Sequence, residues 1–236
     1  MTIEHRNSGE DLELRVGNGE WFKLLDPPQL NQAESQALCQ WLALQWSQFP
    51  QAGSATVCLP RVLSQPSGEA VCFYPGSFSP WHQGHQECVR QASEIMPVMI
   101  IPDANPWKNQ EHREVNFNEV VKIAKALPEG CHLYTGFVHL NSGNPTSSWL
   151  PKTNWSKRYL CMGEDSFLGL ANWKNIDVLL EALSGLFIIP RKVDTADFIK
   201  AETEIKKIKK DIAIKQMSRH QYEEVSSSEI RKQETP

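Results

Sequence analysis

The 236-residue sequence lacks any apolar run of the roughly 20 residues that a membrane-spanning helix needs. It also lacks a secretory signal at its start, because Met1 to Glu13 carry charges of both signs and no apolar stretch. No internal repeat or low-complexity block is visible. Since 40% of the residues are hydrophobic, we expect a globular cytoplasmic protein that is not inserted in a membrane.

Paired cysteines are absent as well. The six cysteines are widely scattered and form no C-x-x-C pair, so we interpret them as reduced thiols of the core rather than as disulfides. Metal ligation by two of them is the alternative. They are Cys39, Cys58, Cys72, Cys88, Cys131 and Cys161.

The sequence also lacks an excess of positive charge. The net charge of −4 argues against a large nucleic-acid-binding surface, so we expect no nucleic-acid partner. The basic run Lys206–Lys210 is the one candidate for a nucleic-acid-binding segment. Because Ile205, Ile208 and Ile212 recur through it at helical spacing, we interpret the run as the solvated face of a helix rather than as an RNA-binding patch.

Apolar runs alternate with helical patterns from Val71 onward. This alternation predicts an α/β domain with a doubly wound parallel sheet, whose ligands bind at the carboxyl ends of the strands. The expected strands are 71–74, 98–101, 132–134, 159–162 and 186–189, and the expected helices are 87–96, 117–127 and 176–183.

Residues 1–69 do not follow this alternation, and we expect a mostly helical N-terminal extension there. Asn31 is a candidate N-cap for a helix with an aromatic stripe that runs to Phe49, before Pro50 ends it. Docking on the α/β domain or across a dimer is the main interpretation, and a partner-binding helix is the alternative. Residues 64–68 form a linker to the second domain, residues 70–236.

The segment Val71–His85 is the most informative stretch. An apolar strand runs into a turn that contains Gly76, Ser77 and Phe78 and then carries His82 and His85, three residues apart. A glycine turn that opens a helix presents backbone N–H groups and the positive end of the helix dipole to an anion. We expect His82 in the turn and His85 at the first helical position, both donating hydrogen bonds or positive charge to phosphate oxygens.

The pattern Gly-Ser-Phe-x-Pro-x-His-x-Gly-His resembles the signature of the nucleotidyltransferase superfamily, the adenylyl- and cytidylyltransferases. A second segment, residues 101–108, resembles the Asn-Pro-x-His-Lys loop of nicotinate and nicotinamide mononucleotide adenylyltransferases, with Trp107 in place of histidine. The resemblance implies that Lys108 reaches toward phosphate as a point charge.

A third segment, residues 162–174, resembles the Gly-x-Asp-Ser-Phe…Trp-Lys stretch of the same adenylyltransferases. Gly163 allows close approach of the backbone, and Asp165 accepts from sugar hydroxyls or lies near a metal. The resemblance places Trp173 at the pyridine ring, where stacking and cation–π attraction favour a pyridinium. A surface aromatic packed on its own domain is the alternative for Trp173.

A fourth segment, residues 225–231, resembles the Ile-Ser-Ser-Thr-x-x-Arg motif that opens the last helix of the superfamily. Its serines Ser227 and Ser228 offer hydroxyl and N–H groups to phosphate, and Arg231 adds a forked cation for pyrophosphate. A plain helix N-cap at Ser227 is the alternative.

Together, the four motifs span about residues 70–231 and imply a Rossmann-like nucleotidyltransferase fold and a pyridine mononucleotide adenylyltransferase of NAD biosynthesis. The partners would be ATP, a pyridine mononucleotide and Mg²⁺, with no metal-ligating residue assigned and a homo-oligomer left open. The resemblance implies catalytic roles for His82, His85, Lys108 and Arg231. The implied ATP-binding residues are Gly76, Ser77, Phe78, His82, His85, Gly163, Asp165, Ser227, Ser228 and Arg231, and the implied mononucleotide-binding residues are Lys108, Thr146 and Trp173.

One segment departs from the family pattern. Where these enzymes have a Ser-Tyr-Thr segment that helps to bind the pyridine substituent, residues 141–151 match it only at Thr146, and Pro151 cuts any helix short. Two alternatives therefore stay open: a transferase that acts on another phosphorylated acceptor, and a nucleotide-binding regulator without turnover. The preference between nicotinate and nicotinamide also stays open.

Overall fold

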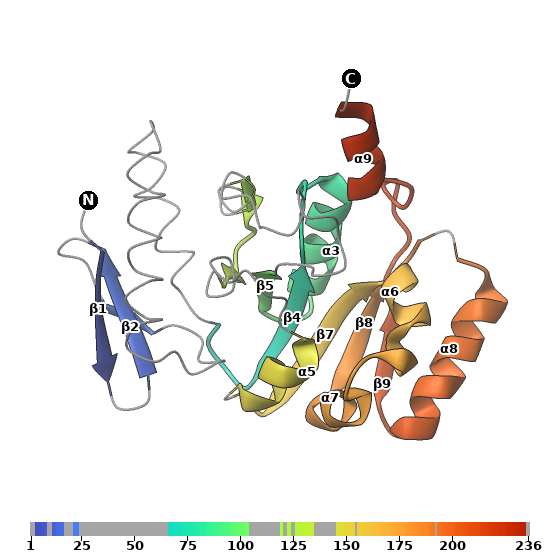
Figure 1. The fold of residues 1–236 in the computed structure, drawn as a ribbon, viewed down its shortest axis with the longest axis horizontal. Coiled ribbons are helices and arrows are strands. Elements are labelled where there is room, and N and C mark those ends of the chain that lie inside the picture. The colour runs from blue at the N-terminus through green and yellow to red at the C-terminus, as the bar shows by residue number, and fades with distance from the viewer. Residues whose placement is uncertain are drawn as a thin grey trace.

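The computed structural model shows a parallel sheet with helices on both faces (Figure 1). Its strands are β4 (Ala70–Gly76), β5 (Val98–Pro102), β6 (Cys131–Leu133), β7 (Lys157–Gly163), β8 (Gly185–Ile189) and β9 (Ala213–Gln216). The structure describes residues 3–8, 11–16, 21–23, 66–103, 119, 122–123, 126–134, 145–153, 155–191 and 193–234.

The strand order of this sheet is β6-β5-β4-β7-β8-β9, and every pairing is parallel. The first three strands run outward from β4 in one direction, and the next three run outward in the other. This order confirms the doubly wound sheet. The order reverses between β4 and β7, and ligands of such sheets bind in the crevice at this point.

The helices of the described residues are α3 (Gln83–Ser93), α5 (Thr146–Trp149), α6 (Glu164–Leu168), α7 (Ile176–Ala182), α8 (Thr195–Ile208) and α9 (Ser227–Glu234), with short 3₁₀ turns η2 (Leu150–Lys152) and η3 (Leu170–Asn172). Helix α3 begins four residues before the predicted helix 87–96. Most of the predicted helix 117–127 lies outside the described residues.

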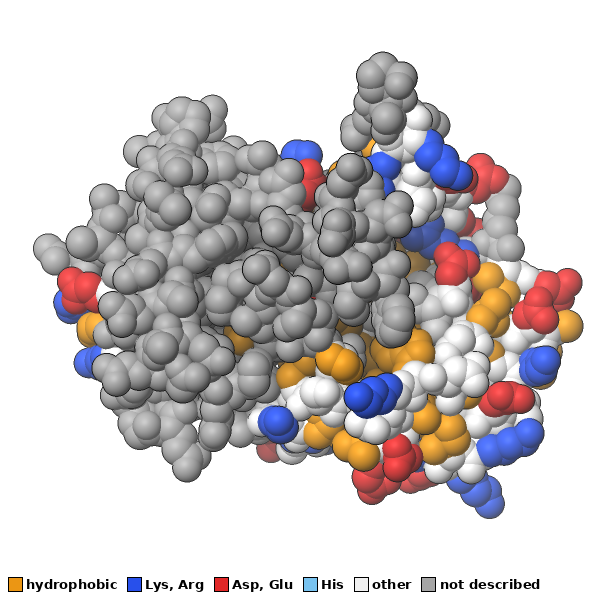
Figure 2. All heavy atoms as spheres, in the orientation of Figure 1, with side chains coloured by type: hydrophobic (Ala, Val, Ile, Leu, Met, Phe, Trp, Pro, Cys, Tyr) orange, Lys and Arg blue, Asp and Glu red, His pale blue; other side chains and the backbone are white. Residues whose placement is uncertain are grey.

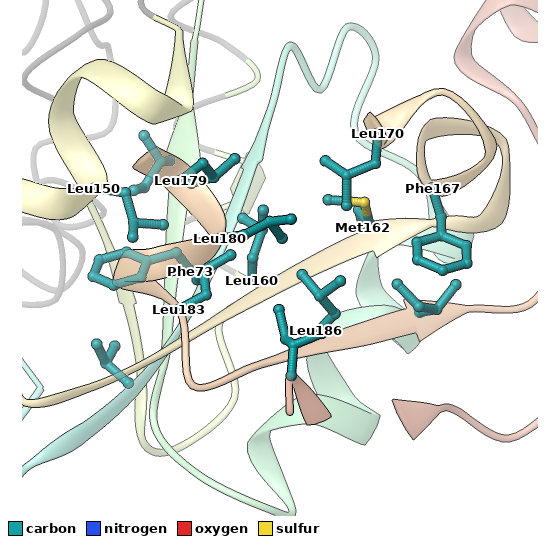
Figure 3. Packing of buried hydrophobic residues seen from close by; sticks show 14 of the residues in the cluster. Phe73, Leu150, Leu160, Met162, Phe167, Leu170, Leu179, Leu180, Leu183 and Leu186 are labelled. Carbon is teal, nitrogen blue, oxygen red and sulfur yellow. The ribbon is translucent and has the colours of Figure 1, made fainter. Parts of the chain in front are cut away.

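The main core lies between the sheet and helices α5–α8. Phe73, Leu160 and Leu186 of three neighbouring strands pack with Leu150 and Leu180 from the helical layer (Figure 3). Strands β5 and β8 are buried along their whole length, and this explains why they read as unbroken apolar runs. A core of this kind fixes the strand ends that carry the site.

The opposite face of the sheet is covered by α3 and contains thiols. Cys72, Cys88, Cys131 and Cys161 are free and buried, as predicted for core thiols, whereas Cys39 and Cys58 lie outside the described residues. Burial raises the pKa of Cys88 to about 12 and that of Cys131 to about 11. These thiols are therefore protonated at neutral pH, and their role is packing.

The basic run is helical only in its first half, because α8 ends at Ile208, which is 42% exposed, and Ile212 lies beyond the helix. Ile205 is buried, and Lys206 and Lys207 are exposed. Lys209 lies past the helix end, where its Nζ donates to the carbonyls of Leu180 and Leu183 at the end of α7. Around α8, basic and acidic side chains are interspersed (Figure 2), so this face presents no continuous basic patch.

The N-terminal residues require a correction. Residues 3–23 contain three antiparallel strands that were not predicted from the sequence, β1 (Ile3–Ser8), β2 (Asp11–Val16) and β3 (Trp21–Lys23), whereas residues 24–65 of the extension lie outside the described residues. The missed signal was the alternation of apolar and charged residues in Leu12-Glu-Leu-Arg-Val16, a period typical of strands. The helix predicted between Asn31 and Phe49 lies outside the described residues. Among those described, no helix is long and apolar enough to cross a membrane.

Candidate active site

The turn between β4 and α3 is closed by its two histidines. His82 is the N-cap of α3, and its Nδ1 accepts from the N–H of Gly84 at 3.1 Å. The N–H of His82 in turn donates to Nδ1 of His85 at 3.4 Å, so the two imidazoles form a capping box. His85 is therefore the third helical residue rather than the predicted first. Because both Nδ1 atoms accept, Nε2 is the protonated nitrogen of each neutral ring.

Side chains lie so close to two glycines of this turn that an added Cβ would force a neighbouring ring to move. A Cβ on Gly84 would lie 3.0 Å from Cε1 of His82, which covers it as the cap. A Cβ on Gly76 would lie 2.9 Å from the ring of Phe78, whose own φ of 42° is unusual for a residue other than glycine. The Gly-x-Phe and His-x-Gly spacings are thus requirements of local packing.

The electrostatics distinguish the roles open to His82. Burial, and secondarily the charge of Arg191, lowers the pKa of His82 from 6.5 to about 4. At neutral pH it therefore donates a hydrogen bond without carrying positive charge. Its Nε2 is buried and has no hydrogen-bond partner among the described residues, so a polar group of a ligand would complete it.

A cavity of about 300 Å³ opens at the carboxyl ends of β4, β7 and β8. It lies where the strand order reverses, as the position of the two motifs on neighbouring strands predicts. The predicted site residues that line it are Gly76, Ser77, Phe78, His85, Gly163, Asp165, Trp173 and Ser227.

A second part of the cavity wall is formed by the segment after β7. Gly163 caps α6 with an ordinary extended conformation, and a Cβ there would find its nearest atom, Nε of Arg191, at 3.8 Å. Asp165 lines the cavity and is exposed. Trp173 also lines the cavity while it packs against the main core, so both interpretations of this tryptophan describe part of its environment.

The C-terminal helix α9 docks on the loop before His82. Ser227 Oγ donates to the carbonyl of Pro80 at 3.1 Å, and the guanidinium of Arg231 contacts the carbonyl of Ser79 and, at 3.1 Å, Ser228 Oγ. The N-cap of this helix is Ser226, whose Oγ accepts from the N–H of Glu229, and not Ser227. The first and last motifs are therefore in direct contact.

Several predicted residues are not among those that line the cavity. His82, Ser228 and Arg231 lie beside it through the contacts above. Thr146 is buried in α5 and does not line it. Lys108 lies outside the described residues.

Arg191 and Glu164 were missed as site residues. Nη1 of Arg191 donates to the carbonyls of Glu223 and Val225, at 3.0 and 2.6 Å, and the residue lines the cavity. Glu164 is 2% exposed, and its carboxylate accepts from the N–H of Arg191 and from Gln216 Nε2. The available signal for Arg191 was the Pro190-Arg191 pair that directly follows the apolar strand. Nothing in the sequence distinguishes the buried Glu164 from its exposed neighbour Asp165.

A divalent cation would find few protein ligands here. Within the described part of the chain, no group of three or more His, Cys, Asp or Glu side chains could hold a metal ion. Asp165 is one carboxylate on the cavity wall. Mg²⁺ is commonly bound by one or two carboxylates together with substrate phosphates, and this donor set fits that mode.

A parallel sheet with a glycine turn and two histidines at the point where the strand order reverses is the arrangement of a nucleotidyltransferase. A family model described as cytidylyltransferase-like matches residues 73–233, and the chain belongs to this family. The probable nicotinate-nucleotide adenylyltransferase of Sulfurovum sp. (strain NBC37-1) is 27% identical over 134 residues, which cover 52% of this chain and 68% of that protein.

Two solved structures share the fold. Both are of the nicotinic acid mononucleotide adenylyltransferase of Plasmodium falciparum, one complexed with APC and one with NaAD. Their TM-scores are 0.50 and 0.52, each at 19% identity, with 70% of this chain and 83% of that chain covered.

Proposed function

We propose that this chain transfers the adenylyl group of ATP to nicotinate or nicotinamide mononucleotide, giving the dinucleotide and pyrophosphate. The observation that carries the proposal is that His85 and Trp173 line one cavity, on walls contributed by neighbouring strands. The names of the similar proteins, which act on the nicotinate form, support the same substrate class.

In this reaction an oxygen of the mononucleotide 5′-phosphate attacks the α-phosphorus of ATP, and the bond from that phosphorus to the β-phosphate oxygen breaks. No side chain needs to become covalently modified. Catalysis is positioning together with stabilisation of charge on the phosphate oxygens.

The histidine turn supplies hydrogen-bond donors in this scheme, and His82 is the neutral one because burial lowers its pKa to about 4. His85 lines the cavity, and Nε2 of His82, which has no partner among the described residues, is a buried N–H donor beside it. Arg191 on the cavity wall and Arg231 on the docked helix supply positive charge for the β- and γ-phosphates. The motif resemblance supports phosphate binding by Ser227 and Ser228 and a point charge from Lys108.

Mg²⁺ bound to the phosphates of ATP would neutralise charge on the phosphate oxygens. Asp165, which lines the cavity, would supply a protein carboxylate. Two statements remain predictions from the sequence: that the protein is cytoplasmic and that it has no nucleic-acid partner. The sequence leaves a homo-oligomer open.

The pyridine side supports the assignment less completely. Trp173 provides an aromatic face for the ring, but Thr146 does not line the cavity and so offers no contact to the pyridine carboxylate or amide. This observation favours, as a second candidate, transfer to another phosphorylated acceptor.

An assay of pyrophosphate release distinguishes the two candidates. Purified protein with ATP and Mg²⁺ is given nicotinate mononucleotide, nicotinamide mononucleotide, glycerol phosphate or phosphopantetheine in separate reactions. The proposal expects turnover with at least one of the two pyridine mononucleotides and none with the others. Turnover with glycerol phosphate or phosphopantetheine alone would replace the proposed function by the second candidate.

A further inference from the structure

Trp81 precedes the two histidines, and its ring is stacked on one of them. The indole, 8% exposed, lies with its centroid 5.2 Å from that of His85 and its plane inclined by 26°. His82 is stacked on the same imidazole with a centroid distance of 3.7 Å and an angle of 24°. Two flat rings are therefore stacked on His85, and Tyr74 and Phe78 contact it edge-on.

The hydrogen bond to His85 from its capping box is long. The donor–acceptor distance from the N–H of His82 to Nδ1 is 3.4 Å, beyond the range of about 2.7–3.2 Å that is usual for N–H donors. A bond of this length restrains an imidazole weakly. The aromatic rings packed against the imidazole therefore add to its restraint.

Phe78 adds an edge-on contact that depends on the same indole. Its ring meets His85 with centroids 5.1 Å apart and planes at 84°, and it meets Trp81 at 5.2 Å and 78°. Removal of the indole would therefore leave space beside both Phe78 and His85.

Trp81 is itself firmly held. Its backbone N–H donates to Glu119 Oε2 at 2.7 Å, and the other oxygen of that carboxylate accepts from Lys122 at 2.6 Å. Its indole Nε1, in contrast, is buried and finds no hydrogen-bond partner in the described part of the chain. Because an unpaired buried N–H destabilises the fold, the position uses the area of the ring and not its donor.

We propose that Trp81 is a positioning residue that keeps the His85 imidazole in the orientation in which Nδ1 accepts from the backbone and Nε2 carries the proton. The proposal concerns the structure of the turn, and its consequence for turnover rests on the proposed function. It would make the residue between proline and histidine of the motif a determinant of catalytic geometry.

The first test uses ligand-free protein and needs no substrate. Side-chain ¹⁵N NMR of His85 should show a single Nε2-protonated tautomer in the unsubstituted protein and in Trp81→Phe, which keeps a flat ring. In Trp81→Leu the two tautomers should mix. Trp155→Leu is the matched control, because Trp155 is also 8% exposed but packs edge-on against Phe73 in the core. An unchanged His85 tautomer in Trp81→Leu would overturn the proposal.

The second test measures turnover. Since a displacement of about 1 Å can cost roughly a hundredfold in rate, Trp81→Leu should lower kcat by roughly ten- to a hundredfold, with both KM values within about twofold. Trp81→Phe should recover most of the loss. In a His85→Ala background, Trp81→Leu should cause no further loss, because the ring it positions is absent.

Independent, multiplying losses in that double variant would contradict the proposal, as would a rise in KM with kcat unchanged. A lower melting temperature without either effect would assign Trp81 to stability alone. If the unsubstituted protein releases no pyrophosphate with either mononucleotide, the proposed function fails, and the NMR result still decides the role of Trp81.

Discussion

The wall formed by the β4–α3 turn and the wall formed by residues 163–173 line one cavity, but their side chains are held differently. On the first wall, His85 is held by stacked rings and by the long hydrogen bond of the capping box, and α9 bonds to the adjacent loop through Ser227 and Arg231. On the second wall, Asp165 is exposed, and Trp173 is held by packing on the core. Under the proposed function, the ordered wall would hold the reacting phosphates and the more open wall would contact the nucleoside parts.

The largest effect should come from the ordered wall. His85→Ala removes a donor aimed at oxygens that gain charge in the transition state, so kcat should fall roughly a hundred- to a thousandfold. Steady-state kinetics measure this, and circular dichroism checks that the fold is intact. Gln86→Ala, an exposed neighbour on the same helix, is the matched control. A kcat within about threefold of the parent would remove His85 from catalysis.

Arg231→Ala should have the next largest effect, and it should fall on one substrate. A charge-assisted hydrogen bond contributes about 1.5–3 kcal/mol, which predicts a rise in the KM for ATP of roughly ten- to a hundredfold. The KM for the mononucleotide should change little. Arg231→Lys keeps the charge without the fork and should be intermediate. Equal losses for both substrates would contradict the assignment to the triphosphate.

On the open wall, Trp173 should give a moderate and selective effect. Trp173→Ala removes the ring and should lower kcat/KM for the mononucleotide by about 1–2 kcal/mol, or roughly five- to thirtyfold. Trp173→Phe should raise that KM only modestly, and the KM for ATP should hardly move. If both variants lower the melting temperature and leave the mononucleotide KM untouched, Trp173 serves packing alone.

The smallest effect concerns stability and pH. The pKa of His82 is about 4 in the folded protein and near 6.5 when unfolded, so between these values only the unfolded state binds the proton. Stability should therefore fall as pH is lowered from 6.5 to 4 and should change no further through this group below pH 4. The melting temperature of His82→Asn, which keeps an N-cap, should fall less over this interval.

Burial also lowers the pKa of His220, so part of the acid sensitivity should persist in the variant. The informative quantity is the difference between the two proteins. An identical pH dependence in both would show that His82 titrates normally in the folded state.

Features that depend on residues close together in the sequence were predicted better than features that depend on distant residues. The doubly wound sheet was predictable because buried parallel strands give continuous apolar runs, and the pairing of β4 with β7 brought two motifs to one crevice as expected. The turn was also predictable because its main contact is local: the N–H of Gly84 donates to His82, two residues earlier.

Long-range features were beyond the sequence. The short strand β9 is mostly exposed and too short to give a clear apolar period, so its pairing with β8 could not be predicted from the sequence. The hydrogen bonds of Arg191 to Glu164 and to the carbonyl of Val225 each join residues about 30 positions apart. Residues 3–23, in contrast, carried a legible strand pattern that the expectation of a helical extension overrode.

The central claim is that the two walls form a single site for a pyridine dinucleotide, and calorimetric titration with nicotinate adenine dinucleotide tests it most directly. One dinucleotide should bind per chain, and Arg231→Ala and Trp173→Ala should each weaken that same binding step. Binding that is unaffected by Trp173→Ala, or that shows two independent sites with one substitution affecting each, would contradict the account.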